Sequence, residues 1–319
     1  MAPSTDSPHY TLEMLADGVY AAIAKDGGSA ISNAGIVDLG DSTLVIDTFL
    51  TPTAAQDLRR DAERLTGRAA RWVLLTHYHN DHIWGAQVFR PGAQIVGTVE
   101  TRKLIETAGK QEYDDYHAIA GDKAKEWQAQ RDSATDDAQR AAAEMWVGYY
   151  GGLVRDFPRL TVTLPTMLFE QHMVLRGGQR RAELIEFNGA HTGSDTIVYL
   201  PDDGIAFMGD LLFAGYHPYF GDGSPERWLE VLRSVQDGTA GMENATRFVP
   251  GHGPVASKDS VQTLIDYITN CQDTARRLGD TEGRDVSDEP VPAKYADWGL
   301  ARFFPANINF LMKGSSKRT

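Results

Sequence analysis

Side chains that can bind metal ions gather in one short stretch of this chain and recur singly at three later points. The stretch WVLLTHYHNDHIWG, residues 72–85, places His77, His79, Asp81 and His82 directly after an apolar run. Such a run is typical of a buried strand, so the four side chains are expected at its carboxyl end. Imidazole nitrogens and carboxylate oxygens together are a ligand set for zinc, and they also suit iron and manganese. The fold must therefore leave room for a metal centre where this strand ends.

Three further ligand-type residues follow predicted strands in the same manner. His191 lies in LIEFNGAHTGSD, Asp210 ends IAFMGD, and His252 sits in the glycine-flanked turn of RFVPGHGP. In open α/β sheets, functional sites collect at the carboxyl ends of strands. Seven ligands are too many for one tetrahedral ion and suit two ions, provided that Asp210 bridges them. The assignment is His77, His79 and His191 on the first metal and Asp81, His82 and His252 on the second.

The first half of the chain alternates strands and helices. Strands are predicted at 18–24, 30–40, 42–48, 71–76 and 93–98, with a short helix at 83–89. A longer helix is predicted at 51–65, where Thr51 is a good N-cap and Pro52 suits the first helical position. This alternation predicts an α/β layered core.

The segment from about 99 to 160 is different, because it is helical and rich in tyrosine and tryptophan. We interpret it as a helical insertion within a single domain spanning 1–319; it either packs on the core or forms a lid over a pocket. Strands resume at 159–169 and in a hairpin over 172–187, followed by further strands, a helix at 224–236 and another at 258–278. The aromatic C-terminal tail, about 280–319, is expected to be docked and serves either as a homodimer contact or as a cap on the monomer.

Charge and composition restrict the possible partners. Acidic residues outnumber basic ones by 44 to 31, giving a formal net charge of −13, which disfavours nucleic acid as a partner. The single cysteine, Cys271, excludes an internal disulfide framework. The start of the chain lacks the features of a signal peptide, and no stretch approaches the roughly 20 apolar residues of a membrane-spanning helix. We therefore expect a cytoplasmic protein that acts on a small molecule and not on a membrane.

The ligand pattern resembles that of the metallo-β-lactamase superfamily, whose signature is H-x-H-x-D-H followed by separate His, Asp and His ligands. The resemblance covers roughly residues 15–279 and implies a four-layer αββα sandwich with a binuclear site along one edge. The stretch MGDLLFAGYHPYFGDGSPERWLEVL is similar to the corresponding segment of glyoxalase II. The C-terminal helical region, however, lacks the Arg/Lys cluster that holds glutathione in that enzyme. β-Lactamases of the first two subclasses carry cysteine where Asp210 stands here.

These observations predict a hydrolase with two zinc ions, or with iron or manganese in their place. A metal-bridging hydroxide would attack an ester, thioester, lactone or amide, and Asp81 would orient this nucleophile. Tyr216 and His217 follow Asp210 closely enough to reach a bound substrate as proton donor or oxyanion partner. Asp47, at the end of the strand LVID, is a candidate to orient a metal-binding histidine.

Three alternatives stay open. The first is an oxidoreductase with one iron that acts on a persulfide, because sulfur dioxygenases share much of this ligand set. The second is a phosphodiesterase or nuclease, which would need phosphate-binding arginines near the site. The third is a binding protein with a metal-stabilised fold, although structural zinc sites are usually closed and mononuclear.

Overall fold

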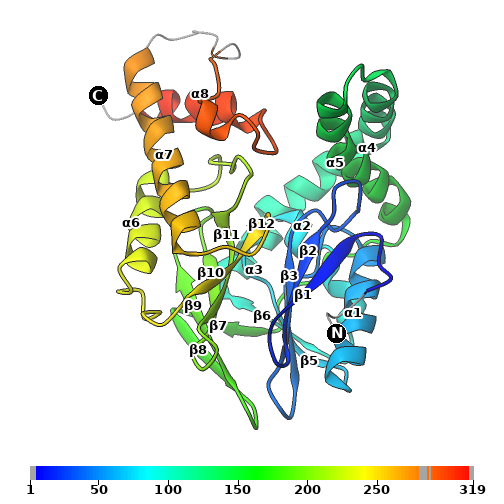
Figure 1. The fold of residues 1–319 in the computed structure, drawn as a ribbon. Helices are drawn as coiled ribbons and strands as arrows, with labels where there is room; N and C mark the ends of the chain where they lie inside the picture. Colours follow the sequence, from blue (N-terminus) through cyan, green and yellow to red (C-terminus); the bar gives the residue numbers. More distant parts are fainter. Residues whose placement is uncertain (1–4, 280–285, 287–288, 316–319) are drawn as a thin grey trace.

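Two β-sheets face each other in the computed structural model, which describes residues 5–279, 286 and 289–315 (Figure 1). The first sheet has the strand order β1-β2-β3-β4-β5-β6-β7. Strands β1 to β4 form an antiparallel meander, and β4 to β7 pair in parallel. Its strands are Tyr10–Ala16 (β1), Val19–Ala24 (β2), Ala34–Asp38 (β3), Thr43–Ile46 (β4), Ala70–Leu74 (β5), Gln94–Thr98 (β6) and Met167–Phe169 (β7).

The second sheet has the order β12-β11-β10-β9-β8. Its β11 and β12 are parallel, and the other neighbours are antiparallel. Its strands are His172–Arg176 (β8), Arg181–Phe187 (β9), Asp195–Leu200 (β10), Ile205–Phe213 (β11) and Arg247–His252 (β12).

Three apolar clusters hold the layers together. One lies between the sheets and takes residues from both, such as Ile46 and Leu74 from the first and Val198 and Phe207 from the second. Another lies on the outer face of the first sheet under α1, and the third lies on the outer face of the second sheet under α6 and α7. This is the four-layer αββα sandwich that the sequence resemblance implied, and that prediction is confirmed.

The helix α1 (Pro52–Thr66) forms where the sequence places its signals. The Thr51 hydroxyl accepts a hydrogen bond from the Ala54 amide, Pro52 occupies the first turn, and Gly67 ends the helix in the left-handed region. Between β5 and β6 lie α2 (Asn80–Ile83) and a 3₁₀ turn, Ala86–Phe89.

The predicted insertion consists of three helices, α3 (Val99–Glu106), α4 (Ala108–Ser133) and α5 (Asp137–Asp156), followed by a 3₁₀ turn, Phe157–Arg159. In Figure 1, α4 and α5 lie side by side and rise from the end of the first sheet. Aromatic contacts join them to each other and to the core, including the Trp127–Trp146 and Trp84–Tyr113 ring pairs. The insertion therefore packs on the core, whereas its role as a lid and the single-domain boundary at 1–319 stay predictions.

The C-terminal part covers the second sheet. The helices α6 (Pro225–Gln236) and α7 (Lys258–Leu278) pack together, and α8 (Phe303–Ser315) contacts α7. A 3₁₀ turn, Ala293–Tyr295, precedes α8. Within the tail predicted at about 280–319, residues 280–285, 287, 288 and 316–319 lie outside the described residues. No helix of the described residues is long and apolar enough to cross a membrane.

Two strand predictions need correction. Strand β1 was not predicted. Glu13 and Met14 are both exposed, so they break the alternation of buried and exposed side chains over Tyr10–Ala16. The strand predicted at 159–169 is confined to Met167–Phe169. Pro165 interrupts that stretch, and a proline has no N–H to donate to a neighbouring strand.

Removing the cap of α1 should destabilise the fold. In Thr51→Ala, the helix loses the side-chain acceptor for the Ala54 amide and the hydroxyl that donates to the Ser29 carbonyl. We expect the free energy of unfolding to fall by about 1–2 kcal/mol in urea titrations. The Thr51→Ser variant keeps the hydroxyl and should lose much less; an equal loss in both variants would show that the cap does not cause the effect.

Candidate metal centre

The loop after β5 positions three histidines and an aspartate. The strand ends at Leu74, and a short loop over 75–79 connects it to α2. This helix turns the chain so that His82 faces back toward His77. The Thr76 carbonyl accepts a hydrogen bond from the Thr196 amide, which fixes the loop to the second sheet. The Ser32 hydroxyl donates to the carbonyl of Asp81 at 2.6 Å.

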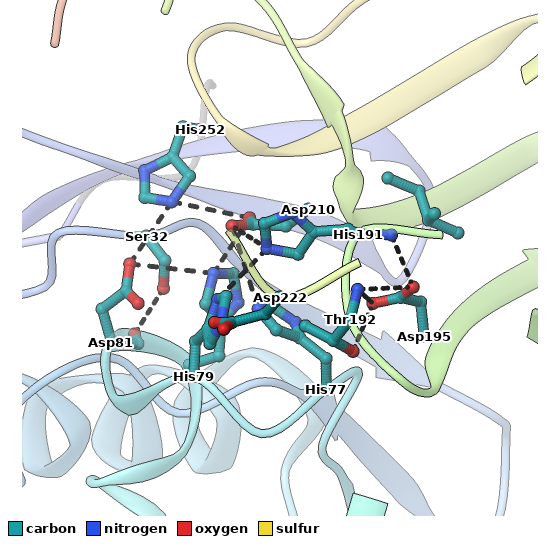
Figure 2. Close-up of polar contacts among 12 residues, drawn as sticks. Ser32, His77, His79, Asp81, His191, Thr192, Asp195, Asp210, Asp222 and His252 are labelled. Carbon is teal, nitrogen blue, oxygen red and sulfur yellow. Dashed lines mark hydrogen bonds and ion pairs between the residues drawn. The ribbon is translucent and has the colours of Figure 1, made fainter. Parts of the chain in front are cut away.

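The structure brings all seven predicted ligand residues together in two groups. His77, His79, His191 and Asp210 form one group, and Asp81, His82 and His252 form the other. Within each group, the candidate ligand atoms lie within 4.8 Å of one another. Figure 2 shows the side chains converging from both sheets. The division agrees with the assignment made from the sequence.

Asp210 lies between the two groups. Its Oδ2 is 3.3 Å from His191 Nε2 and 3.8 Å from His77 Nε2, on the side of the first group. Its Oδ1 is 3.1 Å from His82 Nε2 and 3.5 Å from His252 Nε2, on the side of the second group. One carboxylate therefore offers one oxygen to each group. Asp210 is inside β11 and not at its end as predicted, because the strand continues to Phe213 beyond a register shift at Gly209.

Hydrogen bonds on the outer ring nitrogens leave lone pairs facing inward. The Asp47 carboxylate accepts from His82 Nδ1 at 2.8 Å and from the Thr76 hydroxyl at 2.8 Å. Because the Thr76 hydroxyl donates to Asp47, its oxygen accepts from His77 Nδ1 at 3.0 Å. As a neutral ring, each of these histidines therefore carries its proton on Nδ1 and presents a bare Nε2 to the centre. The prediction that Asp47 orients a histidine of the site is confirmed.

Asp222 orients His79 as Asp47 orients His82, but Asp222 was not predicted from the sequence. Its Oδ2 lies 2.9 Å from His79 Nε2, so that His79 presents Nδ1 toward His191 Nε2 at 3.1 Å (Figure 2). The hydroxyl of Tyr78 also bonds to Asp222. Asp222 is 143 residues away from His79 in the chain, and no local pattern marks it.

The donor set fits metal ions. His77 Nε2, His82 Nε2 and Asp210 Oδ1 are buried and have no hydrogen-bonding partner among the described residues. Buried polar atoms are almost always satisfied, so such orphans indicate a cation as the missing partner. Two facing nitrogens of His79 and His191 at 3.1 Å also need a positive centre between them when neither carries a proton.

The charged groups of the centre shift one another's pKa values. Burial alone would raise the pKa of Asp210, but His252 and His82 outweigh it and hold the pKa well below its usual value. Burial would lower the pKa of His252, but Asp210 and Asp81 outweigh it and raise the pKa to about 9. The pKa of Asp81 is lowered as well, so Asp81 and Asp210 stay ionised and require positive charge nearby. Metal cations can supply that charge in place of protons on the histidines.

Backbone geometry at two glycines allows the close approach of the strands. Gly209 has φ +50°, and a Cβ there would lie 2.8 Å from Thr76 Oγ1. A Cβ on Gly251 would overlap Asp210 Oδ1. Asn33 braces the neighbouring turn, because its amide nitrogen Nδ2 donates to the Pro250 and Gly253 carbonyls at 2.9 and 2.8 Å.

The loop that carries His191 is held by a buried carboxylate. Asp195 accepts hydrogen bonds from the amides of His191 and Thr192 and from the Thr192 hydroxyl, at 2.8 to 3.1 Å (Figure 2). The Ser194 hydroxyl bonds to Glu186 and Thr98 at 2.9 and 2.6 Å. Thr192 and Ser194 thus stabilise the loop.

A cavity of about 540 Å³ opens beside the centre. His79, Asp81, His191, Asp210 and His252 line it, together with residues of the insertion and of the C-terminal segment. Its apolar wall is largely aromatic and consists of Tyr78, Tyr116, Trp146, Tyr149, Phe213, Tyr219 and Phe303, with Ile31, Met145 and Leu300. Glu112 of α4 also lines it, and burial raises the pKa of this carboxyl to about 8.

Tyr216 and His217 lie outside the residues that line this cavity. His217 is buried, its Nδ1 is 2.9 Å from the Tyr267 hydroxyl, and its ring packs on Trp298. The Tyr216 ring is 6.3 Å from that of His252, and its hydroxyl lies toward Asp26. Their catalytic roles stay predictions, and these positions give them no support.

Comparison with known proteins agrees with this geometry. The family model described as "Metallo-beta-lactamase superfamily" matches residues 27–252. That range contains all seven candidate ligands, the first sheet from β3 onward, and the second sheet.

Solved structures share the fold at low sequence identity. A metallo-beta-lactamase from Pontibacter korlensis is 17% identical with a TM-score of 0.59, over 82% of this chain and 99% of that one. The metallo-beta-lactamase FIM-1 from Pseudomonas aeruginosa, in a mono-zinc form, is 16% identical with a TM-score of 0.58, over 83% and 97%. One from Hirschia baltica is 14% identical with a TM-score of 0.57, over 82% and 98%. At these identities the likeness shows the fold.

Adding a methyl group at Gly251 should disrupt the centre. In Gly251→Ala the new Cβ would displace the Asp210 carboxylate. We expect metal retained after dialysis to fall by at least half, measured by elemental mass spectrometry. Gly121→Ala is the control, because its Cβ meets open space on helix α4. Unchanged metal content in Gly251→Ala would contradict the role given to Asp210.

Removing the charge of Asp222 should weaken metal binding without unfolding the chain. In Asp222→Asn, His79 loses the carboxylate that orients it, so we expect metal affinity to fall roughly 10- to 100-fold in competition with a chelator. Asp114→Asn is the control, because Asp114 is exposed on α4, away from the centre, and pairs with Lys110. Equal affinities in the two variants would show that Asp222 does not act through His79.

Proposed function

The chain belongs to the metallo-beta-lactamase superfamily, and on that premise we propose that it is a binuclear metal-dependent hydrolase of a small molecule. Its bond would be an ester, thioester, lactone or amide. Zinc is the proposed metal, because histidine and carboxylate ligands suit it.

The observation that carries this proposal is the position of Asp210. Its two carboxylate oxygens face different groups of histidines, at 3.3 Å from His191 Nε2 and 3.1 Å from His82 Nε2. A site for one ion would need no such division. A carboxylate shared between two ligand groups supports two neighbouring ions, with His77, His79 and His191 on one and Asp81, His82 and His252 on the other.

Each residue of the centre has a distinct task in this scheme. When bound by these residues, two cations would supply an activated water near neutral pH and a positive charge to polarise the bond to be cleaved. Asp81 lines the cavity with its Oδ2 3.3 Å from His252 Nε2, so it can accept a hydrogen bond from the attacking water and orient it. Burial would raise the pKa of Asp81, but His82 and His252 outweigh it and keep this carboxylate ionised.

The cavity supports a small organic substrate with an apolar or aromatic part. Its aromatic wall, formed in part by Trp146, Tyr149 and Phe213, can exclude water from the bond under attack. Its volume of about 540 Å³ is in the range of small-molecule sites.

Metal content per chain tests the number of ions. Protein purified without added metal should contain close to two zinc ions per chain by elemental mass spectrometry. Asp210→Ala should fall toward one ion, because it removes the ligand shared by the two groups. Asp132→Ala, an exposed position on α4, is the control and should retain the normal content. The two-zinc protein should then cleave members of an ester, thioester and lactone panel.

Either of two results would overturn this scheme. One iron per chain with little zinc would favour an oxidoreductase acting on persulfides, and oxygen uptake with such a substrate would then be measured. Two zinc ions with phosphodiester cleavage but no ester cleavage would favour the phosphodiesterase alternative.

A further inference from the structure

The C-terminal segment reaches the cavity from outside the matched family region and brings a positive charge to it. Arg302 lies 50 residues beyond His252, the last matched residue. In the part of the chain that the structure describes, it is the single lysine or arginine among the residues lining the cavity. The same cavity is lined by five candidate metal ligands from both groups, His79, Asp81, His191, Asp210 and His252.

The chain holds this segment firmly in place. The amide of His217 donates to the Gly299 carbonyl at 2.9 Å, and the Gly299 amide donates to the Gly215 carbonyl at 2.9 Å. Asn307 is buried and bonds to the amide of Phe220 and the carbonyl of Pro218, at 3.1 and 2.7 Å. These bonds attach the segment to the loop that follows β11, so Arg302 is fixed relative to the strand that carries Asp210.

The guanidinium group of Arg302 has an aromatic support but no ionic partner within the described part of the chain. It stacks over Trp146 with its carbon 3.5 Å from the ring centroid, and it bonds to the Tyr150 hydroxyl. Among the described residues, no carboxylate lies within ion-pairing distance of it. Trp146 supports the planar group. A guanidinium has more N–H donors than the bond to Tyr150 uses, so the group can still form two parallel hydrogen bonds with a carboxylate.

We propose that Arg302 binds a carboxylate group of the substrate, so that the enzyme prefers anionic esters or related compounds with an apolar body between the carboxylate and the scissile bond. The cavity's own carboxylates favour this orientation. Asp81 and Asp210 face histidines and Asp222 is bonded to His79, whereas Asp115 stands on α4. An anionic group is repelled by Asp115 and attracted by Arg302. The inference rests on the proposed function, because it assigns a substrate class to that same site.

Two esters of equal length test the proposal. Mono-para-nitrophenyl glutarate ends in a carboxylate, and para-nitrophenyl pentanoate ends in a methyl group. For the metal-loaded enzyme, Arg302→Met should lower kcat/KM for the glutarate ester about tenfold or more, mainly through KM, and change that for the pentanoate ester by less than about twofold. An equal change for both esters would overturn the proposal, because loss of the stacking on Trp146 would affect both alike.

Two further variants separate charge from folding. Arg302→Lys keeps the charge but loses the planar fork, so its preference for the glutarate ester should lie between those of wild type and Arg302→Met. If Arg302→Met does not fold, Arg302→Lys alone tests the proposal. A ratio of kcat/KM values for the two esters equal to that of wild type would then contradict paired hydrogen bonding. Arg276→Met removes an exposed arginine of α7 and should leave the ratio unchanged.

Binding of the free carboxylate distinguishes failure of this inference from failure of the proposed hydrolase. If wild type cleaves neither ester, the proposed ester hydrolysis fails. Calorimetry with glutarate and metal-loaded protein then decides about Arg302 alone. Binding about tenfold weaker in Arg302→Met than in wild type would support the carboxylate site, and equal binding would overturn it.

Discussion

The structure depends on keeping two ionised carboxylates and five imidazoles, buried or half-buried, within a few ångströms of each other. The two carboxylates repel each other and the whole cluster loses its hydration. Both effects would destabilise the fold if they were left uncompensated. The chain directs every histidine proton that it fixes outward, to Asp47, Thr76 or Asp222, so that lone pairs face inward. Positive charge at the centre then compensates Asp81 and Asp210 at once. The two sheets, each contributing ligands, are joined through this same compensation.

Residues whose role depends on local spacing could be predicted from the sequence. The stretch from His77 to His82 is one example, since a strand followed by a short loop and a helical turn brings its side chains to one point. Helix α1 is another, because Thr51, Pro52 and Gly67 mark its two ends. Asp47 could be found because it ends a strand beside the ligand-bearing strand.

Residues that depend on distant parts of the chain could not be predicted. Asp222 and Arg302 have nothing unusual around them in the sequence, and their significance comes from contacts with His79 and Trp146. Tyr216 and His217 illustrate the reverse. They are close to Asp210 in the chain, but after Phe213 the backbone turns at Gly215, with φ +74°. The His217 amide then donates to the Gly299 carbonyl, and neither Tyr216 nor His217 lines the cavity.

The order in which the parts are synthesised follows from where the cavity wall originates. All seven candidate ligands have left the ribosome once His252 has emerged, whereas Leu300, Arg302 and Phe303 of the cavity wall emerge later. Because chains begin to fold from the N-terminal side during synthesis, the centre can assemble while one side of the cavity is still missing.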